Sequence, residues 1–199
     1  MTLKHFFIFV FMFFLTKGYA QLAISLKAGI QANDLVVRNS GARYSSGYQT
    51  GYSLHAGAFT MFKVGKRVNL IPEAQLIHKT SRVDGGGSPT TRLTYLEVPF
   101  IASYEATPWL SAEAGPSLGL KITDNTPSRY FNAIDAGANL GIRIKLDSSW
   151  SFLARYYYGL STVDKLYWQG PGSGDLMRLY SQNLQLSVTY SLNQERVSD

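Results

Sequence analysis

The sequence predicts an all-β fold: an eight-stranded antiparallel transmembrane β-barrel, an up-and-down meander preceded by a cleavable signal peptide. Three observations predict it: long segments of alternating polar and apolar residues, connections of alternately long and short length, and an apolar leader. In the segment 134–146, every even position from Ile134 to Leu146 is apolar and every odd position is polar or glycine. This period of two indicates an extended strand with one apolar and one polar face.

The length of the 134–146 segment indicates what surrounds the strand. Its thirteen residues exceed the five or six that are about typical of soluble strands, and they suit a tilted strand across a bilayer, which needs roughly ten. The alternative is a soluble sandwich or lipocalin-like barrel around a dry apolar core. The polar faces of this chain are small and glycine-rich and lack the Lys and Glu density of a solvated surface. That composition favours the membrane barrel.

Residues 1–20 are predicted to be a secretory signal peptide. Lys4 precedes ten consecutive apolar residues, Phe6–Leu15, and a small-residue cleavage site ends at Ala20. Ten residues are too few for a helix across about 30 Å of hydrocarbon, which argues against an uncleaved anchor. We therefore expect the mature chain to begin at Gln21.

The remainder is predicted to be one barrel domain, residues 21–192, followed by a polar tail, residues 193–199. The chain has no cysteine, which excludes disulfides and thiolate metal sites. Its formal charge of +6 falls to +4 when Lys4 and Lys17 leave with the signal peptide, and no basic run is present. We therefore expect no nucleic-acid partner.

Eight segments carry the alternation, and they are the predicted strands: 22–32, 50–62, 68–80, 92–105, 109–121, 134–146, 150–161 and 180–192. In each strand an apolar residue adjoins a polar one on the opposite face. In chain order these neighbouring pairs are Leu26 and Lys27, Leu54 and His55, Leu76 and Gln75, Val98 and Glu97, Leu118 and Ser117, Leu140 and Asn139, Ala154 and Arg155, and Leu186 and Gln185.

The connections between these strands alternate in length. The long ones are 33–49, 81–91, 122–131 and 162–179, and the short ones are 63–67, 106–108 and 147–149. Long outer loops and short periplasmic turns are typical of outer-membrane barrels, and closure removes the free strand edges that lipid cannot satisfy. We expect outer-membrane lipid around the barrel and protein partners at loops 33–49 and 162–179.

Aromatic residues gather near the strand ends, as interface girdles do in outer-membrane barrels. Those near the short turns are Phe62, Tyr104, Trp109, Trp150 and Tyr190, and those near the long loops are Tyr52, Tyr158 and Tyr180.

Charged residues on the polar faces point into the predicted lumen. They are Glu73, Glu97, Glu113, Asp135, Lys27, Lys79, Lys121, Arg143, Lys145 and Arg155. Because eight strands leave an interior that side chains just fill, buried charges there must pair. We interpret Glu73, Glu97, Glu113 and Asp135, with Arg143 and Arg155, as a lumen charge network that forms a plug at mid-height. A narrow conducting pore is the alternative.

The sequence gives little support for an enzyme, a metal site or a cofactor. The mature chain has two histidines, His55 on the polar face and His78 on the apolar face near the outer rim. A His78–Ser81 dyad acting on lipid is a remote alternative, because catalysis requires a nucleophile held beside a base. Asp84–Ser88 is glycine-rich but lacks the strand, helix and Lys-Ser/Thr ending of a phosphate-binding loop.

Four motifs occur in order along the chain: Leu70–Glu73 (LIPE), Tyr95–Phe100 (YLEVPF), Glu113–Pro116 (EAGP) and Arg155–Leu160 (RYYYGL). Across nearly the whole mature length the chain resembles the PorT-like outer-membrane β-barrel family of Bacteroidota. The resemblance implies an eight-stranded outer-membrane barrel and, through the family's name-giver, a link to type IX secretion. The tail departs from the pattern, because the chain does not end on an aromatic residue.

Three prolines fall inside predicted strands: Pro72, Pro99 and Pro116. Each removes a ladder hydrogen bond, so we expect a β-bulge at each.

The sequence therefore predicts a non-enzymatic outer-membrane barrel with a filled lumen, exported to the outer membrane of a Gram-negative cell. It would act through its outer loops or its periplasmic rim as a structural or interaction protein, such as a secretion accessory. A small channel is the main alternative.

Overall fold

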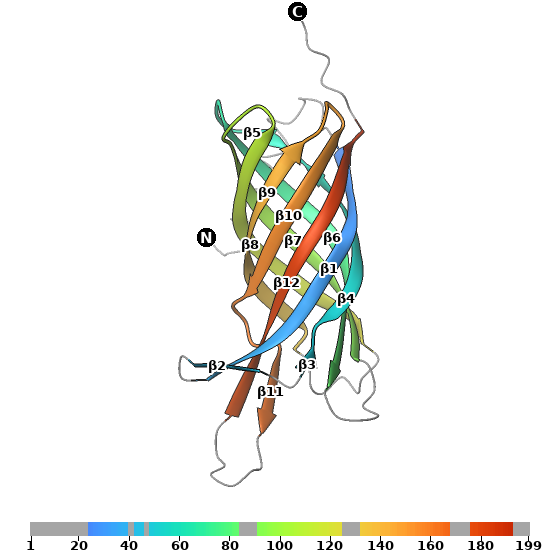
Figure 1. Cartoon of the computed structure of the whole chain (residues 1–199), viewed down its shortest axis with the longest axis vertical. Helices are drawn as coiled ribbons and strands as arrows, with labels where there is room; N and C mark the ends of the chain where they lie inside the picture. The colour runs from blue at the N-terminus through green and yellow to red at the C-terminus, as the bar shows by residue number, and fades with distance from the viewer. Residues whose placement is uncertain are drawn as a thin grey trace, which may run out of the picture.

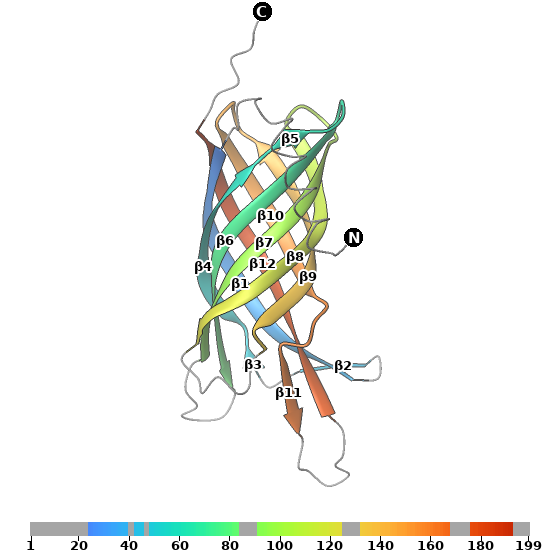
Figure 2. The same ribbon diagram turned by 180° about the vertical axis from the view of Figure 1, so that it is seen from behind.

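The computed structural model describes residues 24–39, 42–45, 48–83, 91–124, 132–167 and 176–192. These residues form one closed antiparallel sheet whose strands are tilted relative to a central axis (Figures 1 and 2). No helix among them is long and apolar enough to cross a membrane. The strands are β1 (Ile24–Asn39), β2 (Ala42–Ser45), β3 (Tyr48–Gln49), β4 (Gly51–Thr60), β5 (Phe62–Lys63), β6 (Val68–Val83), β7 (Thr91–Glu105), β8 (Leu110–Asp124), β9 (Ile134–Lys145), β10 (Trp150–Gly159), β11 (Asp164–Tyr167) and β12 (Leu176–Ser191).

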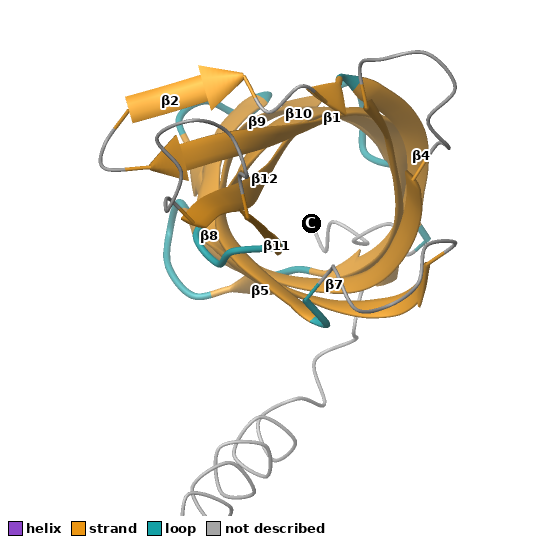
Figure 3. Ribbon diagram, turned by 90° about the horizontal axis from the view of Figure 1, so that it is seen from below, coloured by secondary structure: helices purple, strands orange, loops and turns teal. Residues whose placement is uncertain are grey.

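Eight of these strands form the ring, in the order β12-β10-β9-β8-β7-β6-β4-β1, and β1 pairs with β12 to close it. Figure 3 looks along the axis into this ring. The short strands β3 and β5 pair with β6, on the same side of it as β4. The short strands β2 and β11 pair with β1 and β12, respectively. The predicted eight-stranded meander is confirmed.

The two ends of the barrel differ, and we name them by their connections. The short-turn end carries the connections 64–67, 106–109 and 146–149, and the loop end carries β2, β3 and β11 (Figure 1). The predicted faces also hold, since Leu140 is 67% exposed on the outer face and Asn139 is 3% exposed in the lumen.

The loop end contains more strand than the sequence predicted. β1 continues to Asn39 and pairs with β12 as far as Val37, and β12 already begins at Leu176. Parts of the expected loops 33–49 and 162–179 are therefore strand, including the hairpins formed with β2 and β11. The predicted signal peptide, residues 1–20, and the tail, 193–199, lie outside the described residues.

The bulges expected at the three prolines do not form. Pairing between β4/β5 and β6 is interrupted opposite Pro72, and it is interrupted again near Pro99 and Pro116, but each ladder resumes in the same register. Among the described pairs the register shifts at Thr94/Tyr95, toward the loop end. The barrel thus accommodates a missing N–H donor by omitting pairs, without inserting a residue.

Candidate functional site

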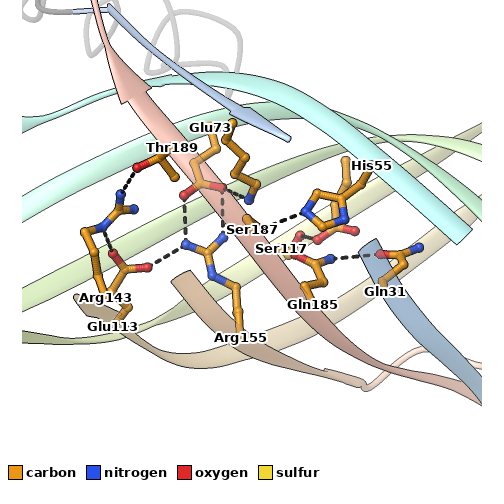
Figure 4. Close-up of polar contacts among 12 residues, drawn as sticks. Gln31, His55, Glu73, Glu113, Ser117, Arg143, Arg155, Gln185, Ser187 and Thr189 are labelled. Carbon is orange, nitrogen blue, oxygen red and sulfur yellow. Dashed lines mark hydrogen bonds and ion pairs between the residues drawn. The ribbon is translucent and has the colours of Figure 1, made fainter. Parts of the chain in front are cut away.

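Five charged side chains meet inside the lumen, and we call them the short-turn cluster: Lys27, Glu73, Glu113, Arg143 and Arg155. All of them except Lys27 are labelled in Figure 4. Arg155 donates from Nη1 and Nη2 to the two carboxylate oxygens of Glu73, at 2.8 Å each, and from Nη2 to Glu113 at 2.6 Å. Arg143 Nε donates to Glu113 at 2.6 Å, and Lys27 Nζ donates to Glu73 at 2.8 Å. Every member is almost completely buried.

The short-turn cluster spans the barrel from wall to wall. Arg155 lies on β10 and Glu73 on β6, and the ring order β10-β9-β8-β7-β6 places these strands opposite each other. Lys27 and Glu113 are each the fourth residue of their strand counted from the short-turn end. On β1 and β8 the cluster therefore lies toward that end, whereas Arg155 is the sixth of the ten residues of β10, so the expected mid-height stays a prediction.

Glycines on intervening strands let these side chains reach their partners. In the ladder, Gly141 lies between Arg155 and Glu113. A Cβ on Gly141 would lie 3.2 Å from Cβ of Arg155 and 2.6 Å from the carbonyl oxygen of Ala154. The glycine thus keeps open the path along which Arg155 crosses β9.

The same arrangement recurs at a histidine–serine pair. Gly29 lies in register between His55 and Ser187, and His55 Nε2 meets Ser187 Oγ at 2.8 Å across β1. Both side chains are buried in the lumen, and His55 Nδ1 has no partner among the described residues. A catalytic dyad needs an oriented base and access for substrate, and this pair has neither.

A second group of polar and aromatic residues lies nearer the loop end, and we call it the loop-end cluster: Lys79, Tyr95, Asp135, Tyr157 and Ser181. Lys79 Nζ donates to Asp135 at 2.8 Å and to Ser181 at 3.1 Å. The rings of Tyr95 and Tyr157 lie 4.8 and 5.2 Å from the same nitrogen, within the range of cation–π attraction. Tyr157 also donates its hydroxyl to Asp135 at 2.7 Å.

The predicted charge network is thus divided in two. The structure joins Glu73, Glu113, Arg143 and Arg155, but it places Asp135 in the loop-end cluster. The expected pairing of Glu97 with arginine is wrong. Glu97 instead accepts a hydrogen bond of 2.5 Å from Ser117.

Sequence reasoning missed the roles of Lys27, Lys79 and Tyr157. The alternation did place both lysines in the lumen, so the missing information was which strand each one reaches. For Tyr157, the available signal was a large aromatic residue that faces the lumen beside a glycine, Gly137. A Cβ on Gly137 would lie 2.5 Å from the ring of Tyr157.

The predicted girdle residues lie mostly on the outer face. Tyr104, Trp109, Trp150 and Tyr190 are exposed near the short turns, and the rings of Trp150 and Tyr190 lie 4.7 Å apart. Near the loops, Tyr52 is exposed. Phe62 and Tyr158 are half-buried, and the ring of Tyr158 lies 3.9 Å below the guanidinium of Arg38. Their role as a lipid-interface girdle remains a prediction.

One polar site lies outside the strands, in the turn between β9 and β10. The carboxylate of Asp147 accepts backbone N–H donors from Ser149 and Trp150 at 2.7 and 2.8 Å. These two bonds hold the pKa of Asp147 below its ordinary value of 3.8. No group of three or more His, Cys, Asp or Glu side chains that could hold a metal ion occurs in the described part of the chain.

The comparison with protein families decides the class of this barrel. Residues 17–165 match the model of the outer membrane protein beta-barrel domain. The chain belongs to this family. The membrane in question is therefore the outer membrane of a Gram-negative cell. No curated protein matches the sequence.

The comparison with solved structures gives similar outer-membrane proteins, one of them with a TM-score above 0.5. Neisserial surface protein A is similar with a TM-score of 0.53 and 13% identity, over 85% of this chain and 97% of that one. OprG from Pseudomonas aeruginosa has a TM-score of 0.48 and 12% identity, over 86% and 96% of the two chains. At these identities the likeness concerns the fold alone.

Proposed function

We propose that the protein is a non-enzymatic outer-membrane barrel with a lumen closed to ions, which acts as an interaction protein through its loop end. The observation that carries the closed lumen is the Arg155 guanidinium, which reaches Glu73 on the opposite side of the barrel and also binds Glu113 on β8. A bidentate arginine–carboxylate pair fixes its geometry, and an ion that passed would have to break it. Lys79 and Asp135 form a second barrier nearer the loop end.

Two features support the loop end as the interacting surface. β1 and β12 continue beyond the ring there and pair with β2 and β11, so the sheet projects from the barrel (Figure 1). The short-turn end has only brief connections, such as 64–67 and 146–149. Among interaction roles, the resemblance to the PorT-like family favours an accessory of a secretion machine.

Planar-bilayer recording tests the closed lumen. We expect no steady conductance from the wild type. We expect channel activity from a variant that removes both barriers (Arg155→Ala, Glu73→Ala, Lys79→Ala and Asp135→Ala), which also shows that the protein inserts. A steady conductance from the wild type would establish the alternative, a small channel.

Cross-linking in intact outer membranes tests the interaction role. A variant with residues 168–175 replaced by a short Gly-Ser linker should lose a cross-linked partner. A variant with the 147–149 turn altered is the matched control and should retain it. The reverse result would place the interaction at the periplasmic rim.

A further inference from the structure

A group of polar side chains lies on the outer face of the barrel at the loop end, on β1, β10 and β12. We call it the outer patch, and its members are Asp34, Arg38, Tyr158, Arg178, Tyr180 and Gln182. Their strand neighbours Tyr157, Leu179 and Ser181 are almost completely buried on the inner face. Because adjacent residues of a strand point to opposite faces, the members of the outer patch point away from the lumen.

Arg38 is at the centre of the outer patch. The carbon of its guanidinium lies 3.9 Å from the ring centre of Tyr158 and 4.4 Å from that of Tyr180, within the range of cation–π attraction. Its Nη1 donates to the carbonyl oxygen of Gly159 at 2.9 Å. Contacts from β10 and β12 thus hold the guanidinium against the outer wall of the barrel.

The hydrogen-bonding groups that lack partners in the outer patch are donors. Nε and Nη2 of Arg38 and Nε2 of Gln182 have no hydrogen-bond partner among the described residues. The acceptor oxygen of Gln182 is already bonded by the Tyr156 hydroxyl at 2.8 Å. Since a buried donor without an acceptor is costly, these nitrogen atoms require an acceptor that the described chain does not supply.

Basic residues stand in line across four neighbouring strands at this end of the sheet. Arg38 is in register with Arg43 of β2, and Arg178 is in register with Lys165 of β11. The pairing between β1 and β12 stops one residue before Arg38 and Arg178. Asp34, the acidic member of the patch, is exposed, and the two arginines of the patch outnumber it. Like charges on opposite residues destabilise a sheet, so this row favours an anionic ligand.

The guanidinium of Arg38 lies at the height of lipid headgroups. The apolar outer face of β12 ends at Leu184, whose partner on β1 is Ala32. The bond to Gly159 places the guanidinium near the level of Leu35, three residues further along β1. At about 3.3 Å per residue and a tilt of about 40°, this level is roughly 8 Å beyond the apolar band. The headgroup layer of a bilayer is roughly 5–8 Å deep on each side.

We infer that the outer patch binds the phosphate group of a lipid in the leaflet at the loop end. Arginine matches phosphate because its planar guanidinium donates two parallel hydrogen bonds to the oxygen atoms. The exposed Arg178 is the first charge that such a headgroup meets, and a turn of the half-buried Tyr180 ring opens the way to Arg38. The acyl chains of the same lipid would lie along Leu184 and the apolar band, which a free phosphate ion would not contact. Because the long connections of outer-membrane barrels face outward, this leaflet is the outer one.

Native mass spectrometry of the full protein from octyl glucoside micelles tests the binding, with lipid A as the phosphate-bearing probe. We expect one lipid A to remain bound to the wild type, and an Arg38→Gln, Arg178→Gln variant to bind it about tenfold more weakly. Lys66→Gln, Arg67→Gln is the matched control, since it removes the same charge from exposed residues of a short turn. Equal weakening in the two variants would show that net charge attracts the lipid, and it would overturn the site.

Carbon–phosphorus dipolar NMR tests the contact in the wild type, without relying on a variant that folds. The protein, labelled at the guanidinium carbon of arginine, is placed in digalactosyldiacylglycerol vesicles in which lipid A is the only source of phosphorus. We expect dephasing of the Arg38 signal, which the Arg38→Gln variant assigns by its loss. Absence of dephasing at Arg38 would overturn the inference.

Inorganic phosphate in place of lipid A distinguishes the two sources of the anion. We expect no dephasing of the Arg38 signal at the same phosphate concentration. Dephasing by inorganic phosphate alone would contradict a lipid site. These readouts use no conductance and no protein partner, so the inference stands or fails separately from the proposed function.

Discussion

Arg155 and Glu73 meet across the full width of the barrel, from strands that stand opposite each other in the ring, through two hydrogen bonds of 2.8 Å. Side chains from opposite walls can touch because an eight-stranded barrel is just wide enough to be filled by them. This contact joins two strands that do not pair with each other, and it should therefore contribute to the stability of the closed ring.

Removing Arg155 should destabilise the barrel. Arg155→Ala deletes three charge-assisted hydrogen bonds, and breaking a buried ion pair costs about 3–5 kcal/mol. Denaturation in lipid vesicles measures the loss. Lys145→Ala is the control, since its pair with Glu105 is partly exposed and should be worth less than about 1 kcal/mol.

A double-mutant cycle separates the true partner of Arg155 from its neighbour. Glu73→Gln combined with Arg155→Ala should show a coupling of roughly 0.5–3 kcal/mol, whereas Glu97→Gln should be additive within about 0.5 kcal/mol. The reason is that Glu97 bonds Ser117 and not Arg155. Stronger coupling to Glu97 than to Glu73 would contradict the geometry of the cluster.

Gly141 should tolerate no side chain. In Gly141→Ala the new Cβ would meet the Ala154 carbonyl oxygen at 2.6 Å and Arg155 at 3.2 Å, and overpacking of this kind costs about 1–3 kcal/mol. Gly65→Ala is the matched control, because its nearest contact would be at 3.8 Å. Equal stability of the two variants would show that the barrel wall at Gly141 can move.

The sequence predicted the strands and their faces well, because a membrane barrel requires strict alternation wherever it crosses lipid. It could not predict the pairing inside the lumen. Whether Arg155 reaches Glu73 or Glu97 depends on the ring register and on Gly141, which belongs to a different strand. Those relations involve residues far apart in the chain, and a pattern along one strand carries no information about them.

The ends of β1 and β12 were missed for a different reason. Residues Leu35, Val36 and Val37 are apolar in succession, so the period of two is lost although β1 continues. Beyond the apolar band a strand no longer needs an apolar outer face. Hydrogen bonding to β12 and to β2 maintains the extended backbone there.

The turn after β9 should respond to acid. Asp147 is the hydrogen-bond acceptor of that turn, and its pKa is held below 3.8 in the folded protein. A carboxylate with a lowered pKa contributes order above its unfolded value and loses it as the pH falls through the folded value. We expect the amide signals of Ser149 and Trp150 to shift with a midpoint below pH 3.8. Asp147→Asn should abolish that titration, and persistence of the shift in this variant would assign it to another group.

Processing of the N-terminus gives a prediction about export. The leader pattern predicts cleavage after Ala20. Mass spectrometry of the protein from outer-membrane fractions should find Gln21 as its first residue. Recovery of the chain in the soluble periplasmic fraction after gentle lysis would argue against its insertion.

A charged residue introduced on the outer face should destabilise the barrel more, the nearer it lies to the bilayer midplane. Leu140 lies in the middle of β9 and is 67% exposed, so Leu140→Arg places a guanidinium among lipid chains. The expected loss is about 2–4 kcal/mol near the midplane, falling to roughly 0–1 kcal/mol at the interfaces. Leu146 follows the end of β9 at the short turn and is 60% exposed, so Leu146→Arg is the matched control at shallow depth. Unfolding of both variants in the same vesicles compares them directly. If Leu140→Arg were as stable as Leu146→Arg, the region around Leu140 would face water, and the apolar band would have to lie elsewhere on the barrel.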